Sequence, residues 1–200
     1  GCHVMCDNKG HYNTGIGSYV LHSNTTGDGN TASGSDSLRN NTTGCQNTAS
    51  GYKSLYLNKT GQYNTASGYQ SLYYNKTGQY NTASGYLSLG SNTTGSNNTA
   101  LGYSAGSNLT TGSNCTAIGH GAQFSSASVS NEVVIGNGSV QNVKIGGSST
   151  VVITNSFTDG TASMTGGSLT NVSTLTSGTI TDGTASMTGG SLTNVSTLTS

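Results

Sequence analysis

The chain has 200 residues, of which 30% are hydrophobic and 6% charged, with 31 Gly and neither Pro nor Trp. That is too little apolar mass for an ordinary globular core, and because Asn, Thr, Ser and Gly recur at fixed spacing, order by repetition is favoured over disorder. The formal net charge is zero, so no partnership with nucleic acid is expected. No apolar run approaches the roughly 18 residues of a membrane helix, so no membrane insertion is expected either.

A seventeen-residue repeat organises the first two thirds of the chain, residues 1–130. The residues that begin each copy are Asn13, Asn30, Asn47, Asn64, Asn81, Asn98 and Cys115. Such a unit is too short for a helix pair, and the Asn, Thr and Gly content opposes helix. Short strands remain, so the sequence predicts an all-β, parallel β-solenoid in which each repeat forms one coil.

Two positions of the repeat are always Gly, which indicates a backbone with positive φ or a close approach between coils. The first column is interpreted as the corners of the solenoid and contains Gly34, Gly51, Gly68, Gly85, Gly102 and Gly119. The second column contains Gly27, Gly44, Gly61, Gly78, Gly95 and Gly112.

The faces of each strand follow from the alternation of strand side chains. A strand over residues 48–52 would place Ala49 and Gly51 opposite Ser50. The Ser50 column holds aliphatic residues in three coils, namely Ile16, Leu101 and Ile118. We therefore expect the Ser50 column inside the coil with the Leu55 column, and the small Ala and Gly face against another subunit. Because one rod alone buries little apolar area, the chain is expected to form a homotrimer.

Tyrosine recurs in columns that are candidates for contact with glycans or a receptor. One column contains Tyr52, Tyr69, Tyr86 and Tyr103, a second contains Tyr56 and Tyr73, and a third contains Tyr63 and Tyr80. Stacked aromatic rings also stabilise a solenoid without any ligand, so both interpretations stand.

A further column begins an Asn-x-Thr sequon in each of five coils, followed by Gly. Its members are Asn24, Asn41, Asn58, Asn75 and Asn92. Asn and Gly serve turn geometry, whereas in a secreted eukaryotic chain the same column would be a row of N-glycans.

Catalytic and metal sites are not expected. Gly102–Gly106 matches a nucleophile-elbow string, but these residues are further members of the repeat columns and no helix follows. The acidic residues are scattered, and the four His residues have no metal-ligand spacing. Neither an enzyme nor a cofactor is therefore predicted.

The cysteines do not fix the redox compartment. Cys2 and Cys6 form one Cys-x-x-x-Cys without a second pair. Cys45 and Cys115 lie four coils apart, about 19 Å at one strand spacing per coil, which exceeds the roughly 7 Å limit for a disulfide. These two are expected to be free thiols or to pair between chains.

The pattern changes after the coils. Residues 131–157 contain alternating pairs such as Val133 with Ile135, interpreted as short strands that close the roll. Residues 158–200 begin a 23-residue repeat, from Asp159 and again from Asp182. This part predicts a β-rich stalk, either a β-prism or a β-helix.

Three runs resemble a known family. Residues 98–106 (Asn-Thr-Ala-Leu-Gly-Tyr-Ser-Ala-Gly), 110–119 and 131–137 resemble the head repeats of YadA-type trimeric autotransporter adhesins and the related phage and viral tail-fibre proteins. The resemblance covers about residues 8–147 and implies a left-handed parallel β-roll, three chains around one axis, exposure on a cell surface or virion, and attachment. The 17-residue coil and the Ser residues at positions 33, 50, 67 and 84 depart from that pattern.

The function expected is therefore the shaft of an extracellular or virion attachment fibre that displays a receptor-binding tip. A self-assembling, glycosylated filament or surface-coat protein is the alternative. An ice-binding solenoid is a third class, since the Thr that follows the first Asn also stacks in register. Its single Thr column, flanked by Ala and Tyr, counts against a broad flat Thr array.

Overall fold

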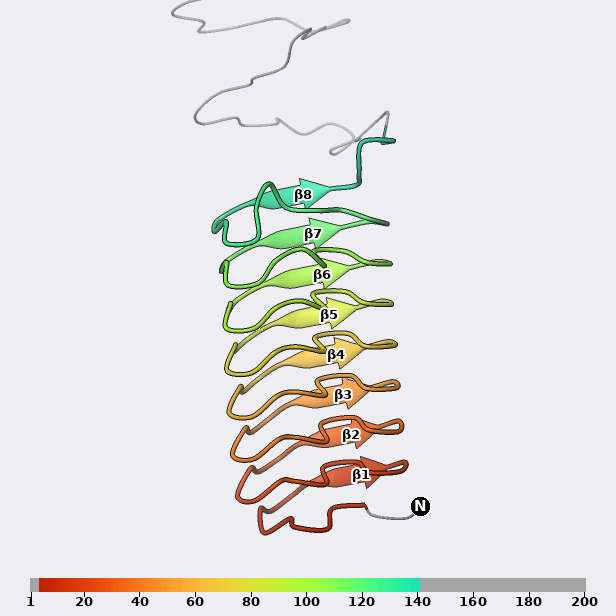
Figure 1. Cartoon of the computed structure of the whole chain (residues 1–200), viewed down its shortest axis with the longest axis vertical. Helices are drawn as coiled ribbons and strands as arrows, with labels where there is room; N and C mark the ends of the chain where they lie inside the picture. Colours follow the sequence, from red (N-terminus) through yellow and green to blue (C-terminus); the bar gives the residue numbers. More distant parts are fainter. Residues whose placement is uncertain (1–3, 141–200) are drawn as a thin grey trace, which may run out of the picture. The chain divides into compact units, whose positions relative to one another are not determined.

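The computed structural model of the chain describes residues 4–140. This part is all-β: eight three-residue strands form one parallel sheet in chain order (Figure 1). The strands are β1 (Thr14–Ile16), β2 (Thr31–Ser33), β3 (Thr48–Ser50), β4 (Thr65–Ser67), β5 (Thr82–Ser84), β6 (Thr99–Leu101), β7 (Thr116–Ile118) and β8 (Val133–Ile135). Each strand pairs with its equivalent one repeat later, so the predicted parallel β-solenoid with 17-residue coils is confirmed.

The last strand continues the same sheet. β8 pairs with β7 in the register of the coils, Thr116 opposite Val133 and Ile118 opposite Ile135. Residues 133–135 thus form a strand, as their alternation predicts, and this strand adds one more layer to the stack. The remaining alternating pairs and the 23-residue repeat lie outside the described residues.

The strands are short because the chain turns at Gly immediately after each one. Gly51 has φ +128°, and a Cβ added to it would lie 2.5 Å from the carbonyl oxygen of Gly68 in the next coil. The second Gly column has a different cause: an added Cβ at Gly61 would lie 2.5 Å from the oxygen of Gly78, without a positive φ. One column therefore requires Gly for its conformation and for close packing, and the other for close packing alone.

The interior differs from the expected one. Ala49 is 1% exposed and Leu55 is fully buried, whereas Ser50 is exposed, and the same pattern holds in the neighbouring coils. The prediction that placed the Ser50 column inside and the Ala column outside is wrong. The Ala column packs with the Leu column in one buried apolar cluster, and because strand side chains alternate, the Ser50 column points outward.

Two columns of Asn complete the interior. In the first, Asn64 donates from its backbone N–H and from Nδ2 to Oδ1 of Asn47, both at 3.0 Å, and from Nδ2 to the oxygen of Gly78 at 2.8 Å. The same bonds recur from coil to coil. The column ends at Cys115, whose N–H donates to Oδ1 of Asn98 at 3.0 Å. Each coil thus supplies the polar partners of the next, which satisfies amides that burial would otherwise penalise.

The C-terminal coils replace these columns with larger apolar groups. Leu109 occupies the second Asn column and is fully buried, and Phe124, 4% exposed, lies against Gly106 where the Leu column would continue. The substitution leaves Oδ1 of Asn92 without a hydrogen-bond partner. The repeat is therefore closed at this end by hydrophobic side chains. Within residues 4–140 there is no helix that has the length and hydrophobicity needed to cross a membrane.

Candidate functional site

The first Tyr column forms a continuous stack of rings along the solenoid. Consecutive centroids from Tyr52 through Tyr69 and Tyr86 to Tyr103 are 5.3, 5.0 and 5.0 Å apart, with interplanar angles of 25°, 8° and 5°. His120 extends the stack at 5.1 Å from Tyr103. All four Tyr rings are partly exposed. The column is therefore a surface ladder whose rings use their faces mainly on one another, which favours the stabilising role.

The second and third Tyr columns are shorter. Tyr56 stacks on Tyr73 with centroids 5.1 Å apart, and Tyr63 stacks on Tyr80 at 5.0 Å. Tyr74 contacts Tyr73 at 77° with centroids 4.7 Å apart. The second column lies beside the first. We name one surface the aromatic face: it consists of these two columns and of the residues that directly follow Tyr52 and its equivalents in the other coils.

Two cationic side chains contact the aromatic face. Nζ of Lys53 lies 5.0 Å from the ring centroid of Tyr52 and 5.5 Å from that of Tyr56, so it bridges the two columns. Its hydrogen bond with the Tyr52 side chain raises the pKa of Lys53 above the usual 10.5, so the ammonium stays charged at neutral pH. Arg39 lies 4.7 Å from the ring of Tyr19.

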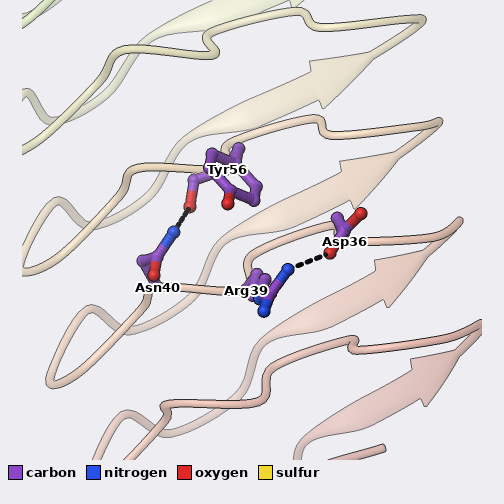
Figure 2. A network of polar contacts seen from close by, with 4 residues as sticks. All are labelled: Asp36, Arg39, Asn40 and Tyr56. Carbon is purple, nitrogen blue, oxygen red and sulfur yellow. Dashed lines mark hydrogen bonds and ion pairs between the residues drawn. The ribbon is translucent and has the colours of Figure 1, made fainter. Parts of the chain in front are cut away.

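Figure 2 shows the polar contacts at the N-terminal end of this face. Nη1 of Arg39 contacts Oδ1 of Asp36 at 2.8 Å, and Nδ2 of Asn40 donates to the backbone oxygen of Tyr56 in the next coil at 2.9 Å. The first contact is a partly buried ion pair between residues three positions apart, whereas the second ties neighbouring coils together. These contacts join residues within and between coils and contain no pair of groups arranged for proton transfer.

The sequon column lies inside the coil. Asn24, Asn41, Asn58, Asn75 and Asn92 are all fully buried. Nδ2 of Asn58, the atom that would carry a glycan, donates to Oδ1 of Asn41 at 2.7 Å and to the oxygen of Gly61 at 3.0 Å. The other members make the equivalent bonds. A glycan on any of these atoms is incompatible with the fold, so the turn interpretation of the sequon column is favoured.

Sequence reasoning also missed sequons that the fold exposes. Asn97 begins Asn-Asn-Thr and is exposed, as is Asn114, which begins Asn-Cys-Thr. If the chain is secreted from a eukaryotic cell and folds, we expect the buried column to carry no N-glycan, because a coil cannot close around an amide nitrogen that bears a glycan. Peptide mapping after enzymatic deglycosylation in heavy-oxygen water checks this. The peptide with exposed Asn97 is the internal control, and label at Asn58 or Asn75 in folded protein would contradict the expectation.

The outer face of the sheet carries the Thr column and the Ser50 column. Thr31, Thr48, Thr65 and Thr82 are exposed, as are the Ser residues two positions later. The Ser50 column becomes aliphatic at its ends, where Ile16 is 67%, Leu101 40%, Ile118 41% and Ile135 49% exposed. This outer surface, formed by the two columns from β1 to β8, is called the sheet face below.

The sheet face carries a wider array of hydroxyl groups than the single Thr column considered for ice binding. The Thr column has the Ser column beside it on the same face, and Tyr52 lies beyond the corner at Gly51. The hydroxyl array is therefore two residues wide. Its aliphatic ends, however, resemble a surface made for protein contact more than a uniform array of Thr.

The residues considered for chemistry do not converge. Ser104 occupies a corner position with φ 51° and follows no strand-to-helix turn. Among residues 4–140, no three His, Cys, Asp or Glu side chains are grouped so as to hold a metal ion. Cys115 is buried at the end of an Asn column and Cys45 is half-buried in a loop before β3, and the two are not joined to each other.

Comparison with known proteins adds no relative. No family model matches the chain, and neither a curated protein nor a solved structure matches it.

Proposed function

We propose that the chain is the structural shaft of an attachment fibre, in which the solenoid holds a receptor-binding tip away from its base. The sheet face carries this proposal. Its aliphatic residues Ile16, Leu101, Ile118 and Ile135 are exposed at both ends of one straight column. Exposed aliphatic residues in register along a sheet are a surface suited to burial against another protein.

Copies of the same chain are the partner that fits this surface. The column runs parallel to the stacking direction of the strands (Figure 1), so equivalent columns of several subunits can lie along one axis and meet residue for residue. The middle of the column is Ser, which is small enough for close approach. The resemblance to the adhesin and tail-fibre repeats favours three subunits, a left-handed coil and a position on a virion or cell surface.

The interior supports a mechanical role. Successive coils are joined by strand pairing and by the two Asn columns. Among residues 4–140, the buried polar side chains come from three positions of the repeat, two occupied by Asn and one by Ser. Such a stack has high order with a thin apolar core, so its mechanical continuity comes from hydrogen bonds along the axis. No cofactor enters this proposal.

Replacing Ile118 by Asp is expected to dissociate the trimer. The carboxylates of three subunits would meet in a surface that excludes water, which is strongly unfavourable. Sedimentation equilibrium over a wide dilution range measures the mass of the native and variant proteins, and far-UV circular dichroism reports the fold. Thr60→Asp is the matched control, because Thr60 is exposed on a bend away from the sheet face.

A concentration-independent trimer that the Ile118 variant converts to a folded monomer supports the proposal. A native monomer would overturn it and leave a solitary solenoid. An open-ended polymer would instead favour the alternative, a self-assembling extracellular filament or surface coat.

A further inference from the structure

A break in the second Tyr column creates a groove on the aromatic face. Tyr56 and Tyr73 stack there, but the equivalent residues of the next two coils are Gly90 and Ser107. A groove of about 330 Å³ follows this break, and Tyr73, Gly90 and Ser107 all line it. The groove thus occupies the place that further rings of the column would fill.

The remaining walls combine apolar and neutral polar groups. Tyr74 meets the ring of Tyr73 at 77°, so the two rings form a corner. Leu87 adds an aliphatic wall, and Gln70 and Ser91 add an amide and a hydroxyl. Burial raises the pKa of the Tyr73 hydroxyl above its usual 10.0, so this group is neutral at physiological pH and is able to donate a hydrogen bond.

This lining selects the chemistry of a ligand. It contains no charged residue, so it offers nothing to balance a phosphate, a sialic acid carboxylate or an amine. Aromatic walls contact a flat apolar surface, and amide and hydroxyl groups at the rim bind hydroxyl groups. A neutral hexopyranose has both properties, because its axial C–H groups form an apolar face and its hydroxyls lie around the edge.

We propose that the groove at Gly90 binds a neutral hexose ring, which contacts Tyr73 and Tyr74 through its C–H face and Gln70, Ser91 or Ser107 through its hydroxyls. The site deepens the proposed attachment role, on which its biological meaning rests, by giving the solenoid itself a point of contact with surface glycans. It differs from the long Tyr52 column, whose rings are stacked on one another without a break.

The repeat supplies variants that test the site. Gly90→Tyr fills the groove with the residue that two earlier coils carry at this position, and Gly90 has no positive φ that would forbid it. An added Cβ there would lie 3.0 Å from the oxygen of Leu87, which a small shift relieves. Tyr73→Ser removes the aromatic wall and uses the residue found at position 107. Tyr80→Asn is the matched control: it removes an exposed Tyr from the third column and installs the residue of position 97.

Saturation-transfer NMR with the methyl α-glycosides of glucose, galactose and mannose measures binding to the native protein and the three variants. We expect transfer to the ring C–H protons of at least one glycoside. Binding should weaken at least about tenfold in the Gly90 and Tyr73 variants, equivalent to about 1.4 kcal/mol, and should be unchanged in the Tyr80 variant. Circular dichroism of each sample confirms the fold.

Absence of transfer from all three glycosides overturns the site, as does equal binding by the Gly90→Tyr variant or equal loss in the Tyr80→Asn control. Sedimentation of the same samples measures the oligomeric state, so the proposed trimer is tested separately from sugar binding. A trimer without sugar contact rejects the groove alone. A monomer whose binding is abolished at Gly90 rejects the trimer alone.

Discussion

Gly68→Ala is expected to destabilise the solenoid strongly. Gly68 has φ +128°, and the new Cβ would lie 2.6 Å from the oxygen and 2.8 Å from the carbonyl carbon of Gly85. Both contacts are with backbone, so no side chain can move aside. Backbone strain and the overlap together should lower the free energy of unfolding by about 4 kcal/mol. Chemical denaturation followed by circular dichroism measures the loss.

Gly29→Asn provides the control for conformational strain. Gly29 also has a positive φ, +65°, but the same position in later coils holds Gln46, Asn97 and Asn114 at φ between 58° and 60°. An added Cβ meets only the end of the Gln46 side chain, which is flexible. We expect this variant to change stability by no more than about 0.5 kcal/mol. Equal losses at both positions would show that close packing between corner glycines does not limit the coil.

Asn58→Leu is expected to have the second large effect, because it interrupts a buried column in the middle. Asn58 donates to Asn41 and Gly61, and its Oδ1 accepts from Nδ2 of Asn75 at 2.8 Å. Leu removes all three bonds and leaves Oδ1 of Asn41 buried without a donor. An orphaned buried polar group costs about 1–3 kcal/mol, so the total loss should be about 3–5 kcal/mol.

The same substitution at the end of the column should cost less. Oδ1 of Asn92 already lacks a partner, and Leu109 occupies this position in the following coil. Asn92→Leu therefore breaks two bonds, to Asn75 and Gly95, removes an unsatisfied oxygen and packs against an existing Leu. We expect its loss to be smaller by about 1–2 kcal/mol. If thermal denaturation shows equal losses for the two variants, hydrogen bonding along the column does not determine the stability of the coil.

The periodicity of the sequence predicts the solenoid well. A constant interval between repeats requires each strand to lie beside its equivalent in the next coil, and the parallel register of β1 to β8 follows directly. The positive φ of the corner glycines was also predictable, because a column that is always Gly indicates a conformation that other residues adopt only with strain. The spacing of the repeats and the backbone conformation of a Gly column can both be predicted from the sequence of a single chain.

Which side of the strand is buried could not be read the same way. Three aliphatic residues in the Ser50 column indicate an interior position when only composition is considered, yet Ile16, Leu101 and Ile118 are exposed. Which side faces inward depends on how the chain turns after the strand, where Leu55 and Lys53 adopt φ values of 51° and 54° normally typical of Gly or Asn. Leu and Lys rarely adopt this left-handed conformation, so their residue types do not predict it.

The burial of the Asn columns escaped prediction for a related reason. A sequon or a turn places Asn58 at the surface, whereas the fold buries its amide between identical amides above and below. Sequence periodicity did contain the signal, because a column of the same polar residue in register is the arrangement that allows each amide to donate and accept. The groove at Gly90 was detectable too, as the first interruption of the Tyr56 column.

The strict superposition of one coil on the next has a consequence for how such a chain changes over generations. If recombination removed residues 47–63, Gln46 would be followed by Asn64 instead of Asn47, and every remaining residue would meet a neighbour from the same repeat position as before. The hydrophobic closure at Leu109 and Phe124 would be untouched. Gene duplication or deletion of a whole repeat therefore alters length in steps of about 4.8 Å while each remaining coil keeps the same kind of neighbours, so selection can adjust length without any redesign of the interior.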